Sequence, residues 1–290
     1  MKRRDFLTDC HPLTGFAFFS LMLGCTMFFL HPLCILSSLL CALAYRVRLC
    51  GAGRNLRFLL PLMLTAAVLN PLFNHEGATI LAYLPGGNPL TLESILFGLA
   101  AAGLLGSVSL WLSCCTTVMS SDKIIYLFGR IAPALSLLLS MALRFIPRFR
   151  AQFRAVDESR HALGLGCADG NVLRRARNTA AVFSILITWA LEGAMKTSDS
   201  MKGRGYGLGG RTAYSLYRIE RRDRLTLLWL GVCALAVLTG GASGGFAWRY
   251  FPTVRGTVSS FFAAYSALCL TPVILNLWEE RVWRLSQSKT

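Results

Sequence analysis

Charge is scarce in this 290-residue sequence, because Asp, Glu, Lys and Arg together make up only 15% of it. A soluble domain of ordinary composition carries about 25% charged residues. Hydrophobic residues instead reach 54%, and the mean hydropathy is +0.52. This balance excludes an ordinary soluble domain and indicates a membrane protein.

The hydrophobic residues also lack the every-second-residue alternation that is typical of strands in a membrane β-barrel. They gather in uninterrupted runs close to the roughly 20 residues with which a helix crosses a bilayer. Lipid offers backbone groups no hydrogen-bonding partner, so runs of this kind form helices. The sequence therefore predicts an all-α, polytopic bundle of membrane helices.

Motifs that carry chemistry are largely missing. No GxxxxGK[ST] phosphate-binding loop and no CxxC pair occurs, and most of the 10 cysteines lie inside apolar runs as packing residues. We therefore predict no metal, no cofactor and no catalytic residue. Any ATP that drives this protein would be hydrolysed by another chain.

One short stretch keeps an enzymatic alternative open. Gly241-Ala242-Ser243-Gly244 resembles the GxSG pattern of intramembrane serine proteases. A nucleophilic serine needs a base, and no histidine lies in a later apolar run. A polytopic intramembrane enzyme, a protease or a lipid-modifying protein, is thus the second interpretation.

Acidic residues are nearly absent from the apolar runs, which argues against a secondary transporter that titrates buried acids. The exception is Glu192, which we expect to form a surface ion pair with Lys196 one helical turn on.

Six apolar runs predict membrane spans. The second is short, and we expect it to extend or to tilt. In the fourth, Ala102 and Gly106 are four residues apart, a spacing that permits close helix packing. The runs cover approximately Leu13–Leu30, Pro32–Tyr45, Phe58–Phe73, Leu92–Val118, Leu225–Gly240 and Val258–Leu277.

The net charge of +16 indicates how these spans are oriented. Residues 46–57 contain four arginines, whereas residues 75–91 contain no Lys or Arg. Because Lys and Arg favour cytoplasmic loops, we expect both termini inside the cell. Arg249 and Arg255 are the exception, since they lie in a loop predicted outside. The basic residues flank membrane spans, so we expect lipid and no nucleic acid as a partner.

Residues 119–224 are too long for a connection between spans. They contain the apolar stretches Ile131–Ile146 and Thr179–Met195, which would leave the topology unchanged if both crossed the membrane. Each is continuous with a basic, helix-permitting stretch, which favours long cytoplasmic helices whose apolar faces need a cover. We therefore predict transmembrane helices in 1–118, a basic cytoplasmic module in 119–224, and two further spans with a short cytoplasmic tail in 225–290.

Two stretches of this module stand out. One begins at Ala142 and runs through several arginines to Ala162-Leu163-Gly164, and the other is Ser200–Gly207. We expect Gly205 to end a helix whose last turn contains Arg204. Arg204 then either caps its own helix only, or presents its guanidinium to an acidic groove of a partner.

With these stretches the chain resembles a family, the transmembrane T component of energy-coupling factor (ECF) transporters, which includes cobalt- and nickel-type permease subunits. The resemblance rests on His11-Pro12-Leu13, Asn70-Pro71-Leu72-Phe73, Leu143-Arg144-Phe145-Ile146-Pro147, and Met201–Tyr206 followed by Gly210-Arg211-Thr212. It implies long coupling helices that join two ABC ATPase subunits to a substrate-binding S component in a bacterial or archaeal cell membrane. It also implies import of a vitamin or a metal ion.

The resemblance further implies which residues meet the ATPases. Members carry an Ala-Arg-Gly motif at the ends of two coupling helices, and Gly203-Arg204-Gly205 matches the second motif with Gly in place of Ala. The first reads Ala162-Leu163-Gly164 and lacks the arginine, for which Arg160, three residues before Leu163, is the candidate replacement. The residues implied to support the coupling helices are Arg144, Phe145, Pro147 and Tyr206.

Overall fold

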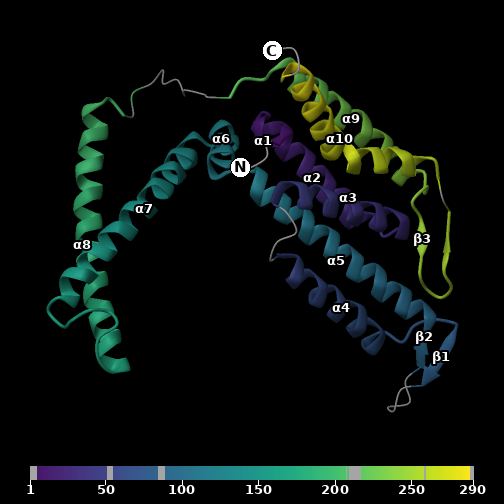
Figure 1. Ribbon diagram of the computed structural model, residues 1–290, viewed down its shortest axis with the longest axis horizontal. Helices are drawn as coiled ribbons and strands as arrows, with labels where there is room; N and C mark the ends of the chain where they lie inside the picture. The colour runs from purple at the N-terminus through teal and green to yellow at the C-terminus, as the bar shows by residue number, and fades with distance from the viewer. Residues whose placement is uncertain are drawn as a thin grey trace. The chain divides into compact units, whose positions relative to one another are not determined.

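The computed structural model describes residues 5–50, 55–83, 89–206, 208, 217–257 and 259–287 (Figure 1). These residues are mostly helical, as the apolar runs predict. Two short antiparallel hairpins, in loops, are the departure from an all-α fold. The helices are α1 Phe6–Asp9, α2 Pro12–Phe28, α3 Pro32–Cys50, α4 Asn55–Phe73, α5 Leu92–Val118, α6 Ser121–Ile131, α7 Pro133–His161, α8 Val172–Gly203, α9 Arg221–Ala242 and α10 Phe261–Gln287; the strands are β1 Ile80–Tyr83, β2 Pro89–Thr91, β3 Trp248–Arg249 and β4 Arg255–Gly256.

The chain forms two compact units. Residues up to Ile124 and from Tyr217 onward make up the first, which we call the bundle. Residues 125–216 make up the second, and α7 and α8 are its main helices, so we call it the two-helix unit.

Five helices in the described residues are long and apolar enough to cross a membrane. They are Pro32–Leu49 of α3 and the helices α5, α8, α9 and, as far as Arg281, α10. Two shorter apolar helices, Pro12–Phe28 and Phe58–Phe73, accompany them. The expected extension of the second run is confirmed, because α3 continues to Cys50. Helix α8, which the sequence places in the cytoplasm, also has the length and composition of a span.

Helix α5 is packed among α2, α3 and α4 in the bundle. Its Trp111 is fully buried against the rings of Phe18 and Tyr45, and Trp111 Nε1 donates a 3.0 Å hydrogen bond to Ser38 Oγ. A Cβ added at Gly106 would lie 2.7 Å from Met63 Sδ. The predicted close packing along this face of α5 is therefore confirmed.

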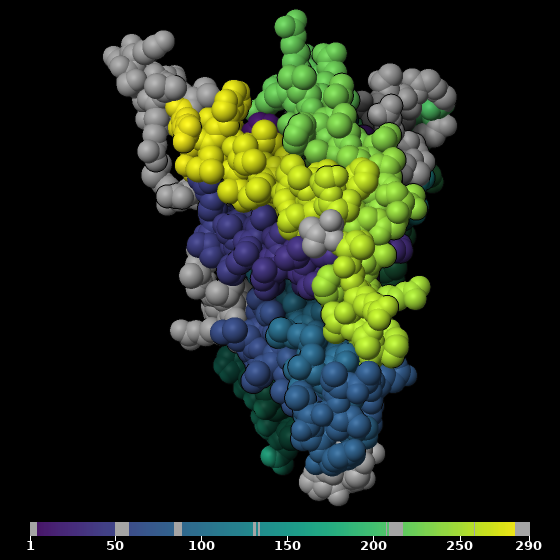
Figure 2. Space-filling view, turned by 90° about the vertical axis from the view of Figure 1, so that its right-hand side faces the viewer, coloured from purple at the N-terminus to yellow at the C-terminus, as the bar shows by residue number. Residues whose placement is uncertain are grey.

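Three connecting segments meet at one end of the bundle. Ala78 N donates to Pro252 O over 3.1 Å, which joins the loop before α5 to the loop after α9. Tyr250 Oη donates to Leu30 O over 2.9 Å and adds the turn between α2 and α3. Figure 2 shows the segment after α9, in yellow-green, lying on the blue residues before α5. Arg249 and Arg255 pair across β3 and β4 at this same end.

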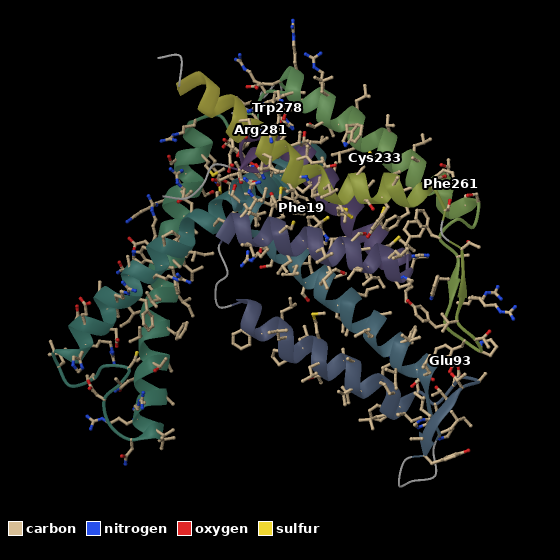
Figure 3. All side chains as sticks on the ribbon, turned by 45° about the vertical axis from the view of Figure 1, so that its right-hand side comes forward. Phe19, Glu93, Cys233, Phe261, Trp278 and Arg281 are labelled. Carbon is tan, nitrogen blue, oxygen red and sulfur yellow. The ribbon has the colours of Figure 1, made fainter. Side chains whose placement is uncertain are left out.

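The opposite end of the bundle carries most of its described charges. Figure 3 shows Glu93 at the end just described and Arg281 at the other. There Arg48 Nη2 lies 2.7 Å from Glu280 Oε1 and ties α3 to α10. The chain leaves the bundle through α6 and returns through α9 at this end.

Candidate functional site: the ends of two crossing helices

Helices α7 and α8 of the two-helix unit run antiparallel and cross (Figure 1). Phe145 stacks on Trp189 with ring centroids 5.6 Å apart, and Phe153 lies 6.4 Å from Phe183. Val182 and Leu186 of α8 are fully buried. These contacts fix the crossing, so the predicted role of Phe145 in supporting the helix pair has a geometric basis.

The other predicted supporting residues of α7 do not share that contact. Arg144 and Pro147 are exposed within this chain, and so are the apolar side chains of Leu135, Leu138 and Ile146. An exposed apolar face of this length is typical of a surface that a membrane or another protein covers.

The two helices end in the same backbone geometry. At the end of α7, Gly164 has φ +70°, its N–H donates to His161 O over 2.9 Å, and Leu165 N donates to Arg160 O over 2.9 Å. This pair of hydrogen bonds is a Schellman motif, in which a glycine takes the left-handed conformation that closes the helix.

At the end of α8 the pattern repeats. Gly205 has φ +75°, its N–H donates to Lys202 O over 3.0 Å, and Tyr206 N donates to Met201 O over 3.0 Å. The prediction that Gly205 ends this helix is confirmed. Tyr206 is therefore part of the helix end through its backbone.

The shared hydrogen bonds give a residue-by-residue alignment of the two ends. Gly164 matches Gly205, Ala162 matches Gly203, and Leu163 matches Arg204. Leu163 is 75% exposed, and Arg204 is also exposed. Two tips of one shape thus present different chemistry, one apolar and one cationic.

Arg160 does not occupy the position of Arg204. In the alignment it matches Met201, one helical turn before the tip. Its side chain is half-buried, and its Nε is buried without a hydrogen bond to any described residue. Leu163, rather than Arg160, is the residue that projects from the end of α7.

A polar network holds the loop that follows α7. One oxygen of Asp169 lies 2.8 Å from His161 Nδ1 and accepts from Gly166 N over 2.8 Å. Asp157 accepts from Cys167 N over 2.8 Å. The hydrogen bond to Asp169, together with its negative charge, raises the pKa of His161. Beyond α8, the predicted Gly210-Arg211-Thr212 and Gly207 lie outside the described residues.

The serine that suggested an enzyme and the acidic residue Glu192 both make local contacts within their helices. Ser243 Oγ donates to Gly240 O over 3.0 Å at the end of α9, which is the behaviour of a helix-terminal serine. Glu192 and Lys196 form the predicted ion pair, 2.7 Å apart and exposed.

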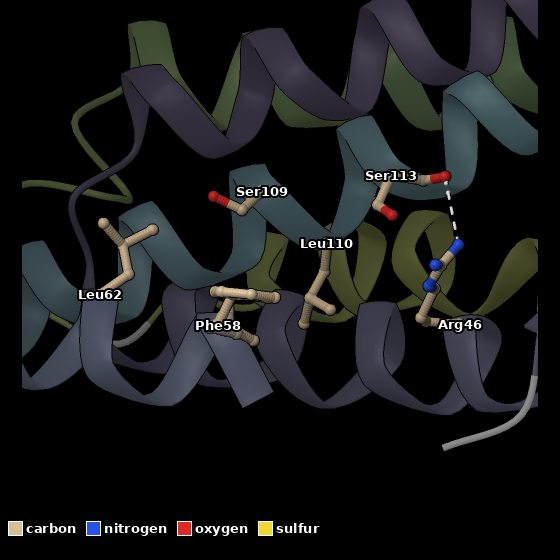
Figure 4. Close-up of a pocket in the computed structure, with 7 residues that line it drawn as sticks. Arg46, Phe58, Leu62, Ser109, Leu110 and Ser113 are labelled. Atoms are coloured by element: carbon tan, nitrogen blue, oxygen red, sulfur yellow. Dashed lines mark hydrogen bonds between the residues drawn. The ribbon is translucent and has the colours of Figure 1, made fainter. Parts of the chain in front are cut away.

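A groove in the bundle offers no catalytic set among the residues that line it. Its volume is about 260 Å³, and it lies between α3, α4 and α5. Arg46 at its edge donates to Ser113 O over 3.3 Å (Figure 4). The rest of the described lining is Phe58, Leu59, Leu62, Ser109 and Leu110.

The sequence prediction missed a group of buried charges in the bundle, Asp5, Lys123 and Asp223. They lie where the chain leaves the bundle and returns to it. The sequence indicates them only by their position, because Lys123 and Asp223 lie close to the two ends of the long basic segment.

Comparisons with known proteins identify the family of this chain. A family model described as CbiQ, cobalt transport protein, matches residues 10–214, a range that includes both helix ends. The energy-coupling factor transporter transmembrane protein EcfT of Bacillus selenitireducens is 26% identical over 213 residues, which cover 70% of this chain and 79% of that protein. EcfT 1 of Listeria monocytogenes is 25% identical over 242 residues, 79% of this chain and 88% of its own length.

Proposed function

Because this chain belongs to the CbiQ family of cobalt transport proteins, we propose that its two helix ends connect a membrane transporter to its motor subunits. The chain is the transmembrane component of an energy-coupling factor transporter, a multi-pass membrane subunit and not an enzyme. It therefore works within a transporter complex.

The proposed arrangement has six spans, α2, α3, α4, α5, α9 and α10, with both termini in the cytoplasm. The three loops that meet near Pro252 lie outside, and residues 125–216 form a cytoplasmic coupling module. Chain geometry supports this assignment over a membrane-crossing α8. Because the chain leaves the bundle and returns at one end, residues 125–216 would cross the membrane twice or not at all. Helix α7 is not among the described helices that are long and apolar enough to cross.

The proposed partners are two ABC ATPase subunits and a substrate-binding S component. Each ATPase would receive one helix end. Arg204 suits a groove with a carboxylate, because a guanidinium binds a carboxylate through two parallel hydrogen bonds. Leu163, at the matching position, suits an apolar pocket. We propose the set Arg160, Ala162, Leu163, Gly164, Gly203, Arg204 and Gly205 as the ATPase-coupling residues, with Arg160 supporting its helix end from one turn away.

The proposed mechanism is mechanical. Helix α8 has 32 residues and is about 48 Å long, so the antiparallel pair holds its two tips far apart. Closure of the ATPases would bring forces to both tips at once, and the crossing at Phe145 and Trp189 would carry them to the apolar faces that an S component covers. The S component would then release an imported vitamin or metal ion.

The observation that carries this proposal is the matched geometry of the two exposed helix ends in a chain of this family. The test is capture of ATPases by the tagged chain from membranes in which both are produced. Arg204→Ala removes a charged hydrogen bond, so we expect affinity to fall by about 1.5–3 kcal/mol.

Arg249→Ala is the matched control, because Arg249 is an exposed arginine of β3, in a loop that the proposed topology places outside the cell and away from both helix ends. We expect it to leave capture unchanged. Equal capture by wild type and Arg204→Ala would contradict the assignment of this tip, and failure of the wild-type chain to capture any ATPase would contradict the coupling role.

A further inference from the structure

Three charged side chains are buried where the coupling module joins the bundle. Asp5, Lys123 and Asp223 are 6%, 5% and 2% exposed. A buried charge is costly unless hydrogen bonds or opposite charges compensate it. Asp5 is part of one short segment, residues 5–11, and Lys123 and Asp223 form hydrogen bonds to that segment.

Lys123 holds the outgoing connection. It lies in α6, next to the last residue of the bundle before the module. Its Nζ donates to Thr8 O over 2.7 Å and to Leu7 O over 3.3 Å. These are charge-assisted hydrogen bonds to carbonyl groups of α1, and they fix the start of α6 on the N-terminal segment.

Asp223 holds the returning connection. Its Oδ1 accepts from His11 N over 3.1 Å, and its Oδ2 accepts from Glu220 N over 3.1 Å. The second bond is half of the capping box that begins α9. The first ties that helix start to the residue that caps α2.

Asp5 fixes the segment itself to the bundle. It accepts from Tyr45 Oη over 2.8 Å and from Asn276 Nδ2 over 2.6 Å. Asn276 Oδ1 in turn accepts from Phe6 N over 2.7 Å. Residues of α3 and α10 thus hold the segment from two sides.

We propose that residues 5–11, with Tyr45, Lys123, Asp223 and Asn276, form a clamp that joins both ends of the coupling module to the membrane spans. The proposal rests on the coupling function proposed above and names the positioning residues for it. A force that reaches either connection from the module then acts on a segment that α2, α3 and α10 hold. A loose joint would let the module move alone.

Hydrogen–deuterium exchange of the purified chain in nanodiscs tests the clamp without any partner. We expect Lys123→Met to speed exchange about tenfold in residues 5–11 and also in residues 217–226, because the two connections share one segment. Lys196→Met is the matched control, since it makes the same substitution at an exposed lysine of α8. We expect it to leave both regions unchanged.

Tyr45→Phe is a milder second variant that keeps the test valid if Lys123→Met fails to fold. It keeps the ring and removes only the hydrogen bond to Asp5, and we expect about threefold faster exchange at both connections. An effect confined to residues 119–131 in Lys123→Met, or to α3 in Tyr45→Phe, would overturn the clamp. Changes of the same size in Lys196→Met would also overturn it, because the faster exchange would then not depend on the clamp residues.

A second measurement uses the chain with captured ATPases. In wild type we expect ATP to alter exchange in α2, α3 and α10. In Lys123→Met we expect capture to persist while this ATP-dependent change falls at least about threefold. An unchanged ATP response would overturn the clamp as a transmitting joint, whereas loss of capture by wild type would count against the coupling function alone.

Discussion

The ends of α7 and α8 have the same backbone conformation. They differ in the side chain exposed at the tip and in the contacts that hold the following residues. Both close through a glycine at positive φ with the same two hydrogen bonds. The α7 end presents Leu163 and is followed by a loop braced by His161 and Asp169, whereas the α8 end presents Arg204. The glycine thus sets the shape of each helix end, and the single residue before it sets which side chain that end presents.

Exchanging the tip residues breaks this comparison most directly. In Leu163→Arg/Arg204→Leu the two glycines stay, so both helix ends keep their shape. If each ATPase groove is matched to its tip, an arginine meets the apolar pocket and a leucine meets the carboxylate. We expect ATPase capture to weaken by about 3 kcal/mol or more, measured by titration of the ATPases onto the immobilised chain.

Leu163→Met is the control for that exchange, because it conserves volume and polarity at the same tip. Capture by the exchanged chain at wild-type strength would mean that the ATPases read shape alone.

Replacing Gly164 or Gly205 with alanine tests whether the two helix ends have the same backbone conformation. An alanine at Gly164 or Gly205 must take a left-handed conformation, which costs about 1–2 kcal/mol. At Gly205 a Cβ would also lie 3.1 Å from Leu208 Cδ1, whereas at Gly164 it meets nothing within 4 Å. We therefore expect Gly205→Ala to lower the thermal unfolding midpoint slightly more than Gly164→Ala.

Gly193→Ala, inside α8, is the matched control. No atom lies within 4 Å of a Cβ there, and alanine favours a helix interior over glycine. A glycine-tip variant that unfolds at the Gly193→Ala temperature would contradict the left-handed ends.

The smallest effect concerns pH, which should distinguish the two ends. Asp169 raises the pKa of His161, and His161 lowers the pKa of Asp169. The contribution of His161 to the stability of this loop is complete below the unfolded pKa of the histidine. It is lost as pH rises through the higher folded pKa. The aspartate's contribution is present above its unfolded pKa and is lost as pH falls through its lower folded pKa.

The loop after α7 should therefore be most strongly protected, relative to the intrinsic exchange rate at each pH, between the folded pKa of Asp169 and the folded pKa of His161. Its protection should fall on the alkaline side of the His161 transition. Exchange of residues 162–171 measured against pH checks this expectation, with His161→Gln as the variant that flattens the profile. Residues 200–206 contain no such pair among the described residues. An equal pH response there would contradict the assignment of the effect to His161 and Asp169.

Much of this molecule follows from local patterns in the sequence. The run Leu92–Val118 coincides with α5, because its apolar stretch begins after a capping threonine and is not interrupted. The stop at Gly205 follows from glycine chemistry alone. Two of the stretches that carry the family resemblance, Leu143–Pro147 and Met201–Tyr206, lie at the crossing of α7 and α8 and at the end of α8.

The rest depends on contacts between residues far apart in the sequence. Asn276 reads as one polar residue in an apolar run, and only the folded chain brings its side chain to Asp5. The resemblance had already aligned Leu163 with Arg204, but only the folded helix end shows that Arg160 lies one turn before the tip with a buried Nε. Hydrophobic periodicity carries no information on either pairing.

Both connections of residues 125–216 arise at one end of the bundle, so this segment is an insertion into a host that is otherwise continuous. A segment inserted at one end of a host can be exchanged between relatives without interrupting the host's own helices. On the function proposed above, such an exchange would change the helix ends that meet the ATPases and keep the membrane helices. Chimeras joined at Ile124 and Tyr217 would retain Lys123 and Asp223 of the host.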